Sequence, residues 1–401
     1  MSRWTIVSIW SRLAKWLGLV AAAVLLLFTA RRWLFTWVVA RARPRLSLPT
    51  WAPPVLALTP LRDEAAALPG FLAAWEEVAY SAENLTLVLI DDASTDATPA
   101  ILRAWAAARL HCHILTLPQR VGKAQALNLA LAAYPRGELI AVYDADERPT
   151  PDALRRLIAP LADSRVAAVS GRRTISNAAD GPAAAYAALE SLVHQNITLT
   201  AKDALTLAPP SLGSHCVYRR SALQAVGGFR PGALLEDSDL SLRLARQGWR
   251  LRYTPDAVSR HAAPATLRGY WRQHTRWARG FYETAWVNRR SPQPARRQQN
   301  GWLRGELALF AVGYLDRLAF LLGLGLAARQ RWLRPILALS LLTPAAQIAL
   351  VWRRAGAPWA LRRQWPWLPF FWGVDMAAAV WGAGAALLRR PRVWESRAQR
   401  A

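Results

Sequence analysis

Cysteine, methionine, lysine and acidic residues are all scarce in this chain of 401 residues. The two cysteines, Cys112 and Cys216, are too few for a disulfide framework, and they fit a reducing compartment as small buried residues. Lysine occurs only as Lys15, Lys123 and Lys202, so the excess of 51 basic over 26 acidic residues is almost entirely arginine. The net charge of +25 indicates a polyanion, an anionic lipid surface or a phosphorylated substrate as partner.

A long apolar run lies near the N-terminus, over residues 16–30, with basic residues on both sides. It is somewhat shorter than the roughly 20 residues that a bilayer crossing needs, but flanking basic side chains such as Lys15 can snorkel. Phe28 stands where a signal peptide would need a small residue before its cleavage site. We therefore predict an uncleaved membrane anchor over residues 1–49 rather than a signal peptide.

Three further apolar runs crowd the C-terminal third, over residues 307–328, 332–351 and 367–388. Each is near bilayer length and carries Trp and Arg at its edges, so we predict about three transmembrane helices within 305–390, with buried soluble helices as the alternative. Asp316, Arg317 and Asp375 lie inside these runs, where ionisable groups are expected to pair or to face a polar cavity. Basic segments, 286–304 and 391–401, are predicted to be a linker and a tail.

The block of residues 50–285 alternates short apolar runs with helical patterns. The predicted strands cover 55–59, 85–90, 113–117 and 139–143, and the predicted helices between them cover 64–79, 98–109 and 123–133. Such alternation predicts βαβ units, and therefore an α/β domain built on a mostly parallel sheet.

Acidic residues gather directly after two of these strands. Asp91 and Asp92 follow the second strand, and Asp144 and Asp146 follow the fourth. Ligands of open parallel sheets bind beyond the carboxyl ends of the strands. Turns and helix caps also use Asp, and this alternative is open for Asp91 and Asp92. Two carboxylates as close as Asp144 and Asp146 repel unless a cation or a hydrogen-bond donor lies between them, and a hard divalent cation would satisfy them, which indicates a Mg²⁺-type site beside a diphosphate.

Six motifs occur in a recognisable order: TPLRDE at 59–64, DDASTDAT, VGKAQALN, DAD, ED at 236–237 and QxxRW at 273–277. In this order the chain resembles the family 2 glycosyltransferases with membrane spans, which include synthases of cellulose, chitin, hyaluronan and poly-N-acetylglucosamine. The resemblance covers about residues 53–280. It implies a GT-A fold, which is a nucleotide-binding α/β sandwich, and a nucleoside-diphosphate-sugar donor.

The resemblance also implies roles for residues around the donor. The loop that contacts the nucleotide is matched by Thr59, Pro60, Arg62 and Glu64. Asp92 matches the acid that recognises the base, and Lys123 matches a basic residue near the nucleotide or its phosphates. Asp144 matches the acid near the ribose, and Asp146 matches the ligand of Mg²⁺ or Mn²⁺. Because a carboxylate can accept the imide N–H of uracil, UDP is the favoured nucleotide.

For the transfer step, the resemblance implies that Asp237 is the general base, with Glu236 beside it. Gln273, Arg276 and Trp277 match the motif that closes over the diphosphate and the acceptor. Asp237 would remove the proton of an acceptor hydroxyl as it attacks the anomeric carbon. The metal and the basic side chains would stabilise the charge that grows on the diphosphate, and a single displacement would invert the anomeric centre.

Several residues depart from the pattern or compete with it. Relatives often carry Thr where this chain has Leu235, which puts the acceptor contacts in doubt. Asp239 is a rival acid, but on a helix it would point away from Asp237. His111 and His113 are expected on the surface or in a strand, whereas His215 lies in a segment that borders the acceptor site in relatives and is a candidate acceptor or metal contact.

The resulting prediction is an inverting glycosyltransferase that uses a UDP-sugar to polymerise a β-linked polysaccharide at the membrane. Transfer of one sugar to a membrane lipid is the alternative, and a non-enzymatic basic membrane protein that binds polyanions is a third hypothesis. We expect a multi-pass protein of a bacterial inner or plasma membrane with its catalytic domain on the cytoplasmic side. Its partners are then the donor, a saccharide or lipid acceptor and the membrane, and no nucleic acid.

Overall fold

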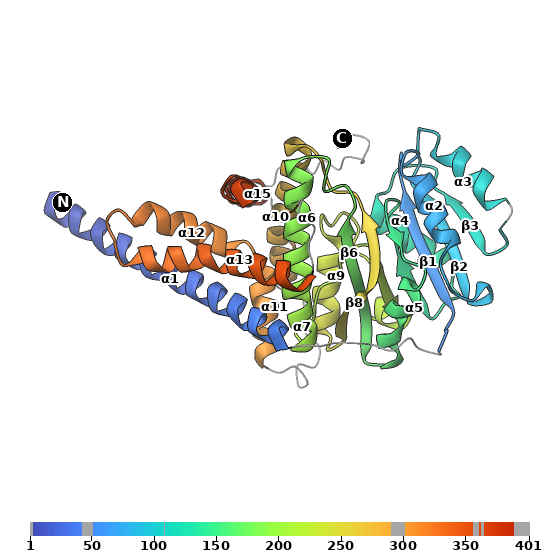
Figure 1. The fold of residues 1–401 in the computed structure, drawn as a ribbon, viewed down its shortest axis with the longest axis horizontal. Coiled ribbons are helices and arrows are strands. Elements are labelled where there is room, and N and C mark those ends of the chain that lie inside the picture. Colours follow the sequence, from blue (N-terminus) through green and yellow to red (C-terminus); the bar gives the residue numbers. More distant parts are fainter. Residues whose placement is uncertain are drawn as a thin grey trace.

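The computed structural model describes residues 3–41, 51–107, 109–289, 301–355, 361 and 365–388. An α/β domain forms one end of the molecule, and long helices extend away from it at the other (Figure 1). The predicted tail at 391–401, most of the predicted linker and the last residues of the predicted anchor lie outside the described residues.

A mixed sheet organises the α/β domain. In the described residues its eight strands have the order β3-β2-β1-β4-β7-β6-β8-β5. The strands are β1 (Val55–Leu61), β2 (Leu85–Asp91), β3 (Cys112–Thr116), β4 (Leu139–Val142), β5 (Arg148–Pro149), β6 (Val166–Ile175), β7 (Cys216–Arg219) and β8 (Arg250–His261). The first four strands pair in parallel, β6 also pairs in parallel with β8, and β7 runs antiparallel to both of its neighbours.

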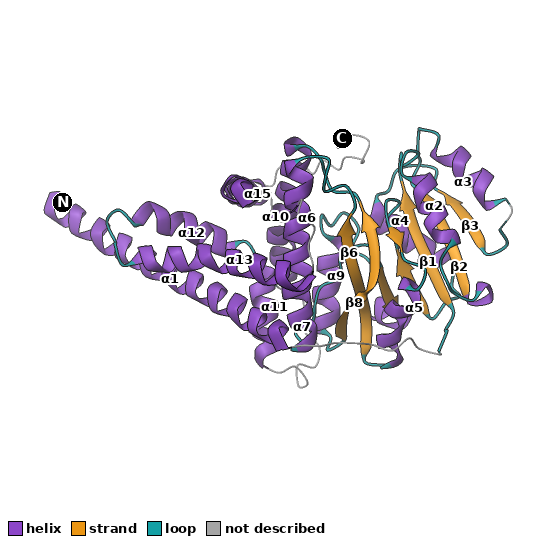
Figure 2. Ribbon diagram, viewed as in Figure 1, coloured by secondary structure: helices purple, strands orange, loops and turns teal. Residues whose placement is uncertain are grey.

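Helices cover both faces of this sheet, as Figure 2 shows. Alternate residues of β1 point to opposite faces, so Leu56 and Leu58 belong to one buried apolar cluster while Val55 and Ala57 belong to another. The helices of this domain are α2 (Leu68–Glu76), α3 (Thr98–Ala106), α4 (Lys123–Ala133), α5 (Ala153–Ile158), α6 (Pro182–Val193), α7 (Thr200–Ala204), α8 (Arg220–Ala225), α9 (Glu236–Arg246) and α10 (Leu267–Asn288). Short helical turns lie at Ala82–Asn84, Ala159–Ala162 and His194–Leu199.

The strands predicted for the first half of the domain are confirmed, and so is the helix over residues 123–133. The helix predicted over 64–79 is shorter, because the chain turns before Leu68 and Pro69 occupies the first helical turn. The helix predicted over 98–109 ends at Ala106.

The remaining helices are α1 (Arg3–Arg41), α11 (Gly301–Ala311), α12 (Leu315–Leu326), α13 (Leu333–Ala355) and α15 (Leu368–Leu387), with a short turn at Trp365–Trp367 before α15. By length and composition, three helices of the described chain could cross a membrane, over Trp10–Arg41, Leu333–Arg354 and Trp365–Leu387. A fourth crossing is formed if the pair α11 and α12, bent by 67°, is one broken span.

These helices pack in two directions. Helices α1, α12 and α13 lie along one another and share an apolar cluster that includes Ala21, Leu25 and Leu337. Helix α15 is seen end-on in Figure 1, so it runs across α1 and α13 rather than beside them. It crosses α10 closely at Gly382, where an added Cβ would lie 2.7 Å from the Cβ of Ala278.

Charged side chains within the apolar helices have partners. Arg32 contacts Asp316, which also lies 3.5 Å from Nη1 of Arg317. Nη2 of Arg31 lies 2.5 Å from Oε1 of Glu306, and Nζ of Lys202 lies 2.9 Å from the same oxygen. Because an isolated charge is costly inside a bilayer, these pairs explain how the apolar runs tolerate ionisable groups, as the sequence predicted.

Candidate active site

One large cavity joins the sheet to the apolar helices. It has a volume of about 1930 Å³, above the roughly 300–1,000 Å³ that suffices for one small ligand. Its lining includes twelve of the thirteen predicted site residues: Pro60, Arg62, Glu64, Asp92, Lys123, Asp144, Asp146, Glu236, Asp237, Gln273, Arg276 and Trp277. From there the lining continues to apolar side chains such as Phe28, Phe320 and Leu341. The cavity therefore has a polar end at the sheet and a mixed end among α1, α12 and α13, where these apolar side chains lie beside Arg31, Arg32, Asp316 and Arg317.

Thr59 is the exception among the predicted residues. Its side chain is fully buried in β1, and its hydroxyl has no hydrogen-bond partner among the described residues. It does not line the cavity, because the alternation of the strand turns it inward while Pro60 lies at the cavity wall. The structure thus separates Thr59 from the other residues of the first motif.

Two side chains fix the loops at the polar end. Nη1 of Arg62 donates hydrogen bonds of 2.7 Å to the carbonyls of Asp92 and Ala93. The carboxylate of Asp92 accepts the backbone N–H groups of Val121 and Gly122 at 2.7 and 2.8 Å. Asp92 is therefore a structural anchor for the loop before α4, and the second lone pair of each oxygen still gives it capacity to accept a ligand N–H.

Lys123 connects the acids of β4 to those of α9. Its Nζ lies 2.7 Å from Oδ1 of Asp144, 2.7 Å from the carbonyl of Gly213 and 3.2 Å from Oε1 of Glu236. Burial by itself would lower the pKa of Lys123, but the charges of Asp144 and Glu236 outweigh it and the pKa is raised. All three N–H donors are thus engaged by protein groups, so Lys123 serves to hold these acids in place.

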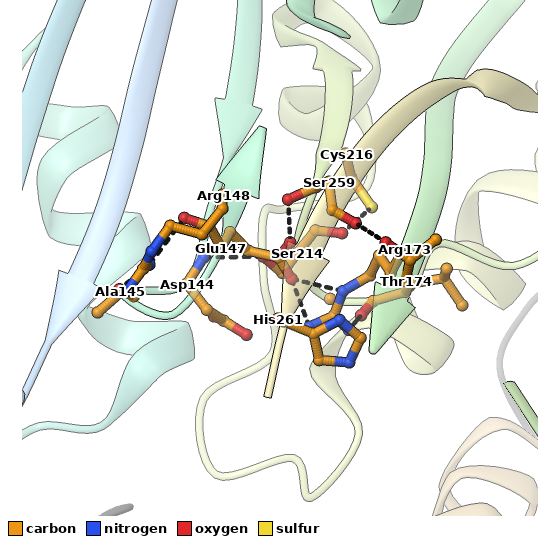
Figure 3. A network of polar contacts seen from close by, with 12 residues as sticks. Asp144, Ala145, Glu147, Arg148, Arg173, Thr174, Ser214, Cys216, Ser259 and His261 are labelled. Atoms are coloured by element: carbon orange, nitrogen blue, oxygen red, sulfur yellow. Dashed lines mark hydrogen bonds and ion pairs between the residues drawn. The ribbon is translucent and has the colours of Figure 1, made fainter. Parts of the chain in front are cut away.

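The loop that carries Asp146 is fixed on both sides (Figure 3). The backbone N–H of Asp144 donates to Oγ of Ser214 at 2.8 Å. Glu147 is completely buried, lies 2.5 Å from Arg173 and accepts a hydrogen bond from Ser259. Burial would raise the pKa of Glu147, but the positive charge of Arg173 and these partners hold it below its ordinary value. Glu147 therefore ties the DAD loop to β6 and β8.

Asp146 is 8% exposed and lines the cavity beside Asp144. Hard divalent cations take carboxylate oxygens together with phosphate oxygens, and one or two protein carboxylates are enough for Mg²⁺. Nζ of Lys123 lies 2.7 Å from Oδ1 of Asp144, and both carboxylates of the pair line the cavity. The donor set therefore fits a hard divalent cation.

Asp237 lies in the first turn of α9, with Glu236 before it. Its Oδ1 accepts the N–H of Ser238 at 2.6 Å. Burial and the neighbouring charge of Glu236 raise the pKa of Asp237 to about 6, against the opposing charges of Lys123 and Arg276. A carboxylate with a pKa near neutrality is suited to general-base catalysis.

Gly213 allows the opposite loop to approach Asp237. It has a φ of +74°, and an added Cβ would lie 3.0 Å from Oδ2 of Asp237. Asp239 points away, as predicted, because it is buried between Arg230 at 2.9 Å and Arg243 at 2.8 Å and accepts from Asn288.

Helix α10 brings Gln273, Arg276 and Trp277 to the cavity wall. Nη1 of Arg276 donates to the carbonyl of Leu234 at 3.2 Å. At Gly280 the helix approaches this loop so closely that an added Cβ would lie 2.5 Å from Cγ of Leu235. Gly280 was not predicted as a packing residue, although a glycine inside a helical pattern costs about 1 kcal/mol relative to alanine and indicates a packing requirement.

Of the five histidines before α10, His194 and His261 line the cavity, whereas the other three do not. His215 is completely buried, with Nε2 3.0 Å from the carbonyl of Ala257, and it does not line the cavity. Burial lowers its pKa to about 4, so it is a neutral structural residue, and the suggestion of an acceptor or metal contact is not supported. His111 and His113 are exposed, as expected.

A second polar group in the cavity was not predicted as a site. Glu190, His274 and Asp375 come from α6, α10 and α15, and their side chains meet in the cavity wall. His274 occupies one of the variable positions of the QxxRW motif, and Asp375 is the acid noted inside the last apolar run.

The mixed sheet with helices on both faces, the acids at its strand ends and the attached apolar helices define a GT-A-type glycosyltransferase site. The chain belongs to the glycosyl transferase family group 2, whose family model matches residues 139–381. The predicted class, a membrane-anchored family 2 glycosyltransferase, is thereby confirmed at the level of the family.

Solved and curated proteins agree with this assignment. A mannosyltransferase, PcManGT, from Pyrobaculum calidifontis, solved in complex with GDP-Man and Mn²⁺, is similar to 94% of this chain and 99% of its own, with 26% identity and a TM-score of 0.65. The "Probable glycosyltransferase YdaM" of Bacillus subtilis is 29% identical over 244 residues, which are 58% of this chain and 58% of that protein.

Two relatives have more specific names. The β-monoglucosyldiacylglycerol synthase of Synechocystis is 29% identical over 305 residues, which are 72% of this chain and 58% of that protein. An N-acetylglucosaminyltransferase of Rhizobium meliloti is 28% identical over 213 residues, which are 51% of this chain and 50% of that protein. The chain thus spans about half to three-fifths of the length of these curated relatives.

Proposed function

We propose that this protein is an inverting glycosyltransferase that moves one sugar from a UDP-sugar to a hydroxyl of a membrane lipid, with Mg²⁺ or Mn²⁺. The observation that carries the proposal is the single cavity that links the strand-end acids to apolar side chains of α1, α12 and α13. Such a cavity suits a water-soluble donor at one end and an amphiphilic acceptor at the other.

The polar end supports binding of a nucleotide. Asp92 offers carboxylate oxygens at the cavity wall for an N–H group of the base, and Asp144 lies where the ribose is expected. Uracil is the predicted base. Guanine also carries N–H donors, and the similar mannosyltransferase was solved with GDP-Man, so the choice between UDP and GDP is part of the test.

The diphosphate is expected between Asp146 and α10. Asp146, with Asp144 beside it, would hold the divalent cation, which supplies positive charge against the oxygens of the leaving diphosphate. Arg276 faces the same space, and its guanidinium can bind two oxygens at once. Trp277 offers a flat ring for a sugar.

Asp237 supports the transfer chemistry. With a pKa of about 6 it is mostly ionised at neutral pH and can accept the proton of the acceptor hydroxyl. The oxygen of that hydroxyl forms the new bond to the anomeric carbon as the bond to the diphosphate breaks. One displacement of this kind converts an α-linked donor into a β-linked product.

The mixed end of the cavity, with apolar and charged side chains side by side, favours an amphiphilic lipid acceptor over a polymer that passes through the protein. The cavity reaches Leu25 on α1 and Ser340 on α13. Beyond this level, α1, α12 and α13 pack directly on one another through a cluster that includes Ala21, Ala327 and Leu333. Apolar contacts among these three helices do not favour a chain of sugars passing between them. A relative named as a β-monoglucosyldiacylglycerol synthase is consistent with a lipid acceptor.

Polysaccharide synthesis, which the sequence predicts, is the second candidate function. The QxxRW motif on the cavity wall and the relatives named as N-acetylglucosaminyltransferases favour it. It would require the product to leave by a route other than passage between α1, α12 and α13.

The test is incubation of membranes containing the protein with a panel of radiolabelled UDP- and GDP-sugars and Mg²⁺ or Mn²⁺. We expect label from one UDP-sugar to enter the organic-extractable lipid fraction, with release of UDP. Membranes carrying the Asp237→Asn variant are the matched control. Label that enters only a high-molecular-weight, water-soluble fraction would overturn the lipid assignment, and the absence of transfer from every donor would overturn the enzyme.

A further inference from the structure

The cluster of Glu190, His274 and Asp375 lies where three helices meet beside the QxxRW motif. His274 is 2% exposed. Its Nδ1 lies 3.0 Å from Oδ1 of Asp375 on α15, and its Nε2 lies 3.4 Å from Oε2 of Glu190 on α6. One imidazole of α10 thus stands between two carboxylates that belong to two other helices.

The ring of His274 also contacts the motif itself. It stacks on Tyr270 with 3.8 Å between ring centroids, and it lies 4.9 Å from the ring of Trp277. The hydroxyl of Tyr270 donates to Asp375 at 2.9 Å and lies 3.5 Å from Glu190. A change in the position of His274 would therefore be transmitted directly to Trp277.

The arrangement fits an imidazolium better than a bound metal ion. One ligand atom from each of the three residues lies within 4.8 Å of the others, but the two nitrogens of His274 face different carboxylates, which suits an ion pair on each side of the ring. The Tyr270 hydroxyl already lies between the two acids, and Arg317 of α12 adds a positive charge that would repel a metal.

The charges around His274 balance when its ring is protonated. Glu190 of α6 and Asp375 of α15 are the facing acids, Arg317 of α12 is the facing cation, and Tyr270 of α10 and Tyr186 of α6 are neutral at ordinary pH. Burial would lower the pKa of His274, but the two carboxylates outweigh burial and the pKa is raised.

We propose that protonated His274 is a positioning residue that clamps α10 to α6 and α15 and thereby sets Trp277 for transfer. This inference rests on the proposed function, because it assigns the clamp a role in that reaction. Because the pKa of His274 is raised, its imidazolium is fully present below about pH 6.5, the ordinary histidine pKa, and acidification weakens the clamp only as it neutralises Glu190, whose pKa burial raises. The clamp is lost as pH rises through the raised pKa of His274, when the two carboxylates face each other without a cation between them.

The first test is the dependence of the transfer rate on pH in the full-length protein in membranes. The wild type should lose rate on the alkaline side, and Glu190→Gln should move this loss to lower pH, because the imidazolium keeps only one carboxylate. His274→Gln should be slower by at least about tenfold at neutral pH and should lack the alkaline loss. His111→Gln, on an exposed histidine far from the cavity, is the matched control. An alkaline loss that stays in place in Glu190→Gln would overturn the clamp.

The second test does not depend on catalysis. The melting temperature of the purified full-length protein is compared with that of His274→Gln across the same pH range. The difference should be largest below about pH 6.5, the ordinary histidine pKa, and should shrink as pH rises. A difference that is constant with pH would show that His274 only fills space.

The two tests separate the possible failures. A wild type that transfers no sugar but shows the pH-dependent melting difference would overturn the proposed function and retain the clamp as a structural device. A tightly bound metal ion that is retained in Asp146→Ala and lost in His274→Gln would replace the clamp with a metal site.

Discussion

The acids at the ends of the strands and the acids among the apolar helices are placed by different means. Asp146 lies in the loop directly after β4, Asp237 lies in the first turn of α9, and both face the cavity. Glu306 and Asp316 are paired with Arg31 and Arg32, which are 275 and 284 residues away in the sequence. The first group is placed by local turns, and the second by long-range packing, so the two groups should respond differently to substitution.

The largest effect should come from Asp237→Asn. The amide cannot accept the hydroxyl proton, so we expect the transfer rate to fall by about 10²–10⁴-fold while binding of UDP is retained. The rate is measured by UDP release and the affinity by calorimetry on the same preparation. Transfer at the wild-type rate would remove Asp237 from the mechanism.

The Asp146→Ala substitution should weaken binding of the divalent metal ion more than Asp237→Asn does. We expect the metal concentration for half-maximal activity to rise by at least about a hundredfold, because changes even in the outer shell of metal sites cost tenfold to hundredfold. The measurement is a Mn²⁺ titration of transfer at fixed donor. Asp180→Ala, an exposed acid outside the cavity, should leave the titration unchanged.

The Glu147→Gln substitution should lower the free energy of unfolding of the domain that carries the strand-end loops. Removing one charge of a buried pair leaves Arg173 without its counter-ion, at a cost of about 3–5 kcal/mol. Thermal unfolding of the detergent-solubilised protein provides the measurement. Glu138→Gln breaks a pair with Arg219 in which Glu138 is 49% exposed, and this control should cost less than about 1 kcal/mol. Equal losses in the two variants would contradict the assigned burial.

Gly280→Ala should test the packing of α10. The added Cβ would lie 2.5 Å from Cγ of Leu235, so the helix must shift, at a cost of about 1–3 kcal/mol together with a lower transfer rate. Gly305→Ala on α11, where an added Cβ meets nothing within 4 Å, is the matched control. Thermal unfolding and UDP release are measured for both variants. If Gly280→Ala changes neither the stability nor the transfer rate, the close contact between Gly280 and Leu235 is not required.

The smallest expected effect is the loss of transfer rate at acidic pH. Because the base acts only when it is ionised, the rate should fall about tenfold per pH unit below the Asp237 pKa of about 6. Initial rates between pH 5 and pH 8 provide the measurement, with the metal at saturation. A rate that does not change between pH 5 and pH 7 would contradict the raised pKa.

The features that could be predicted from the sequence are those that depend on near neighbours in the chain. The apolar run of β4 followed by Asp144 and Asp146 identifies both a buried strand and the acids at its end. The helical spacing between Asp237 and Asp239 separates a cavity residue from a buried structural one. Residue types, strand period and helix period are sufficient for these assignments.

The features that could not be predicted depend on contacts between distant segments. Glu190, His274 and Asp375 lie on three helices, and their meeting is settled by how α15 crosses α10 at Gly382. Length and hydropathy mark α15 as long enough to cross a bilayer, but they do not give its direction across α1 and α13. Thr59 is a miss of a different kind, because strand alternation, which is a local pattern, turns its side chain inward, whereas the motif match alone assigned it to the site.

The close packing of α1, α12 and α13 beyond Leu25 has a consequence for the membrane as a whole. If the product is a glycolipid whose headgroup does not pass between these three helices, each molecule would stay in the leaflet where it was made. Glycosylation would then create a difference between the two leaflets, and a separate flippase would be needed to remove it.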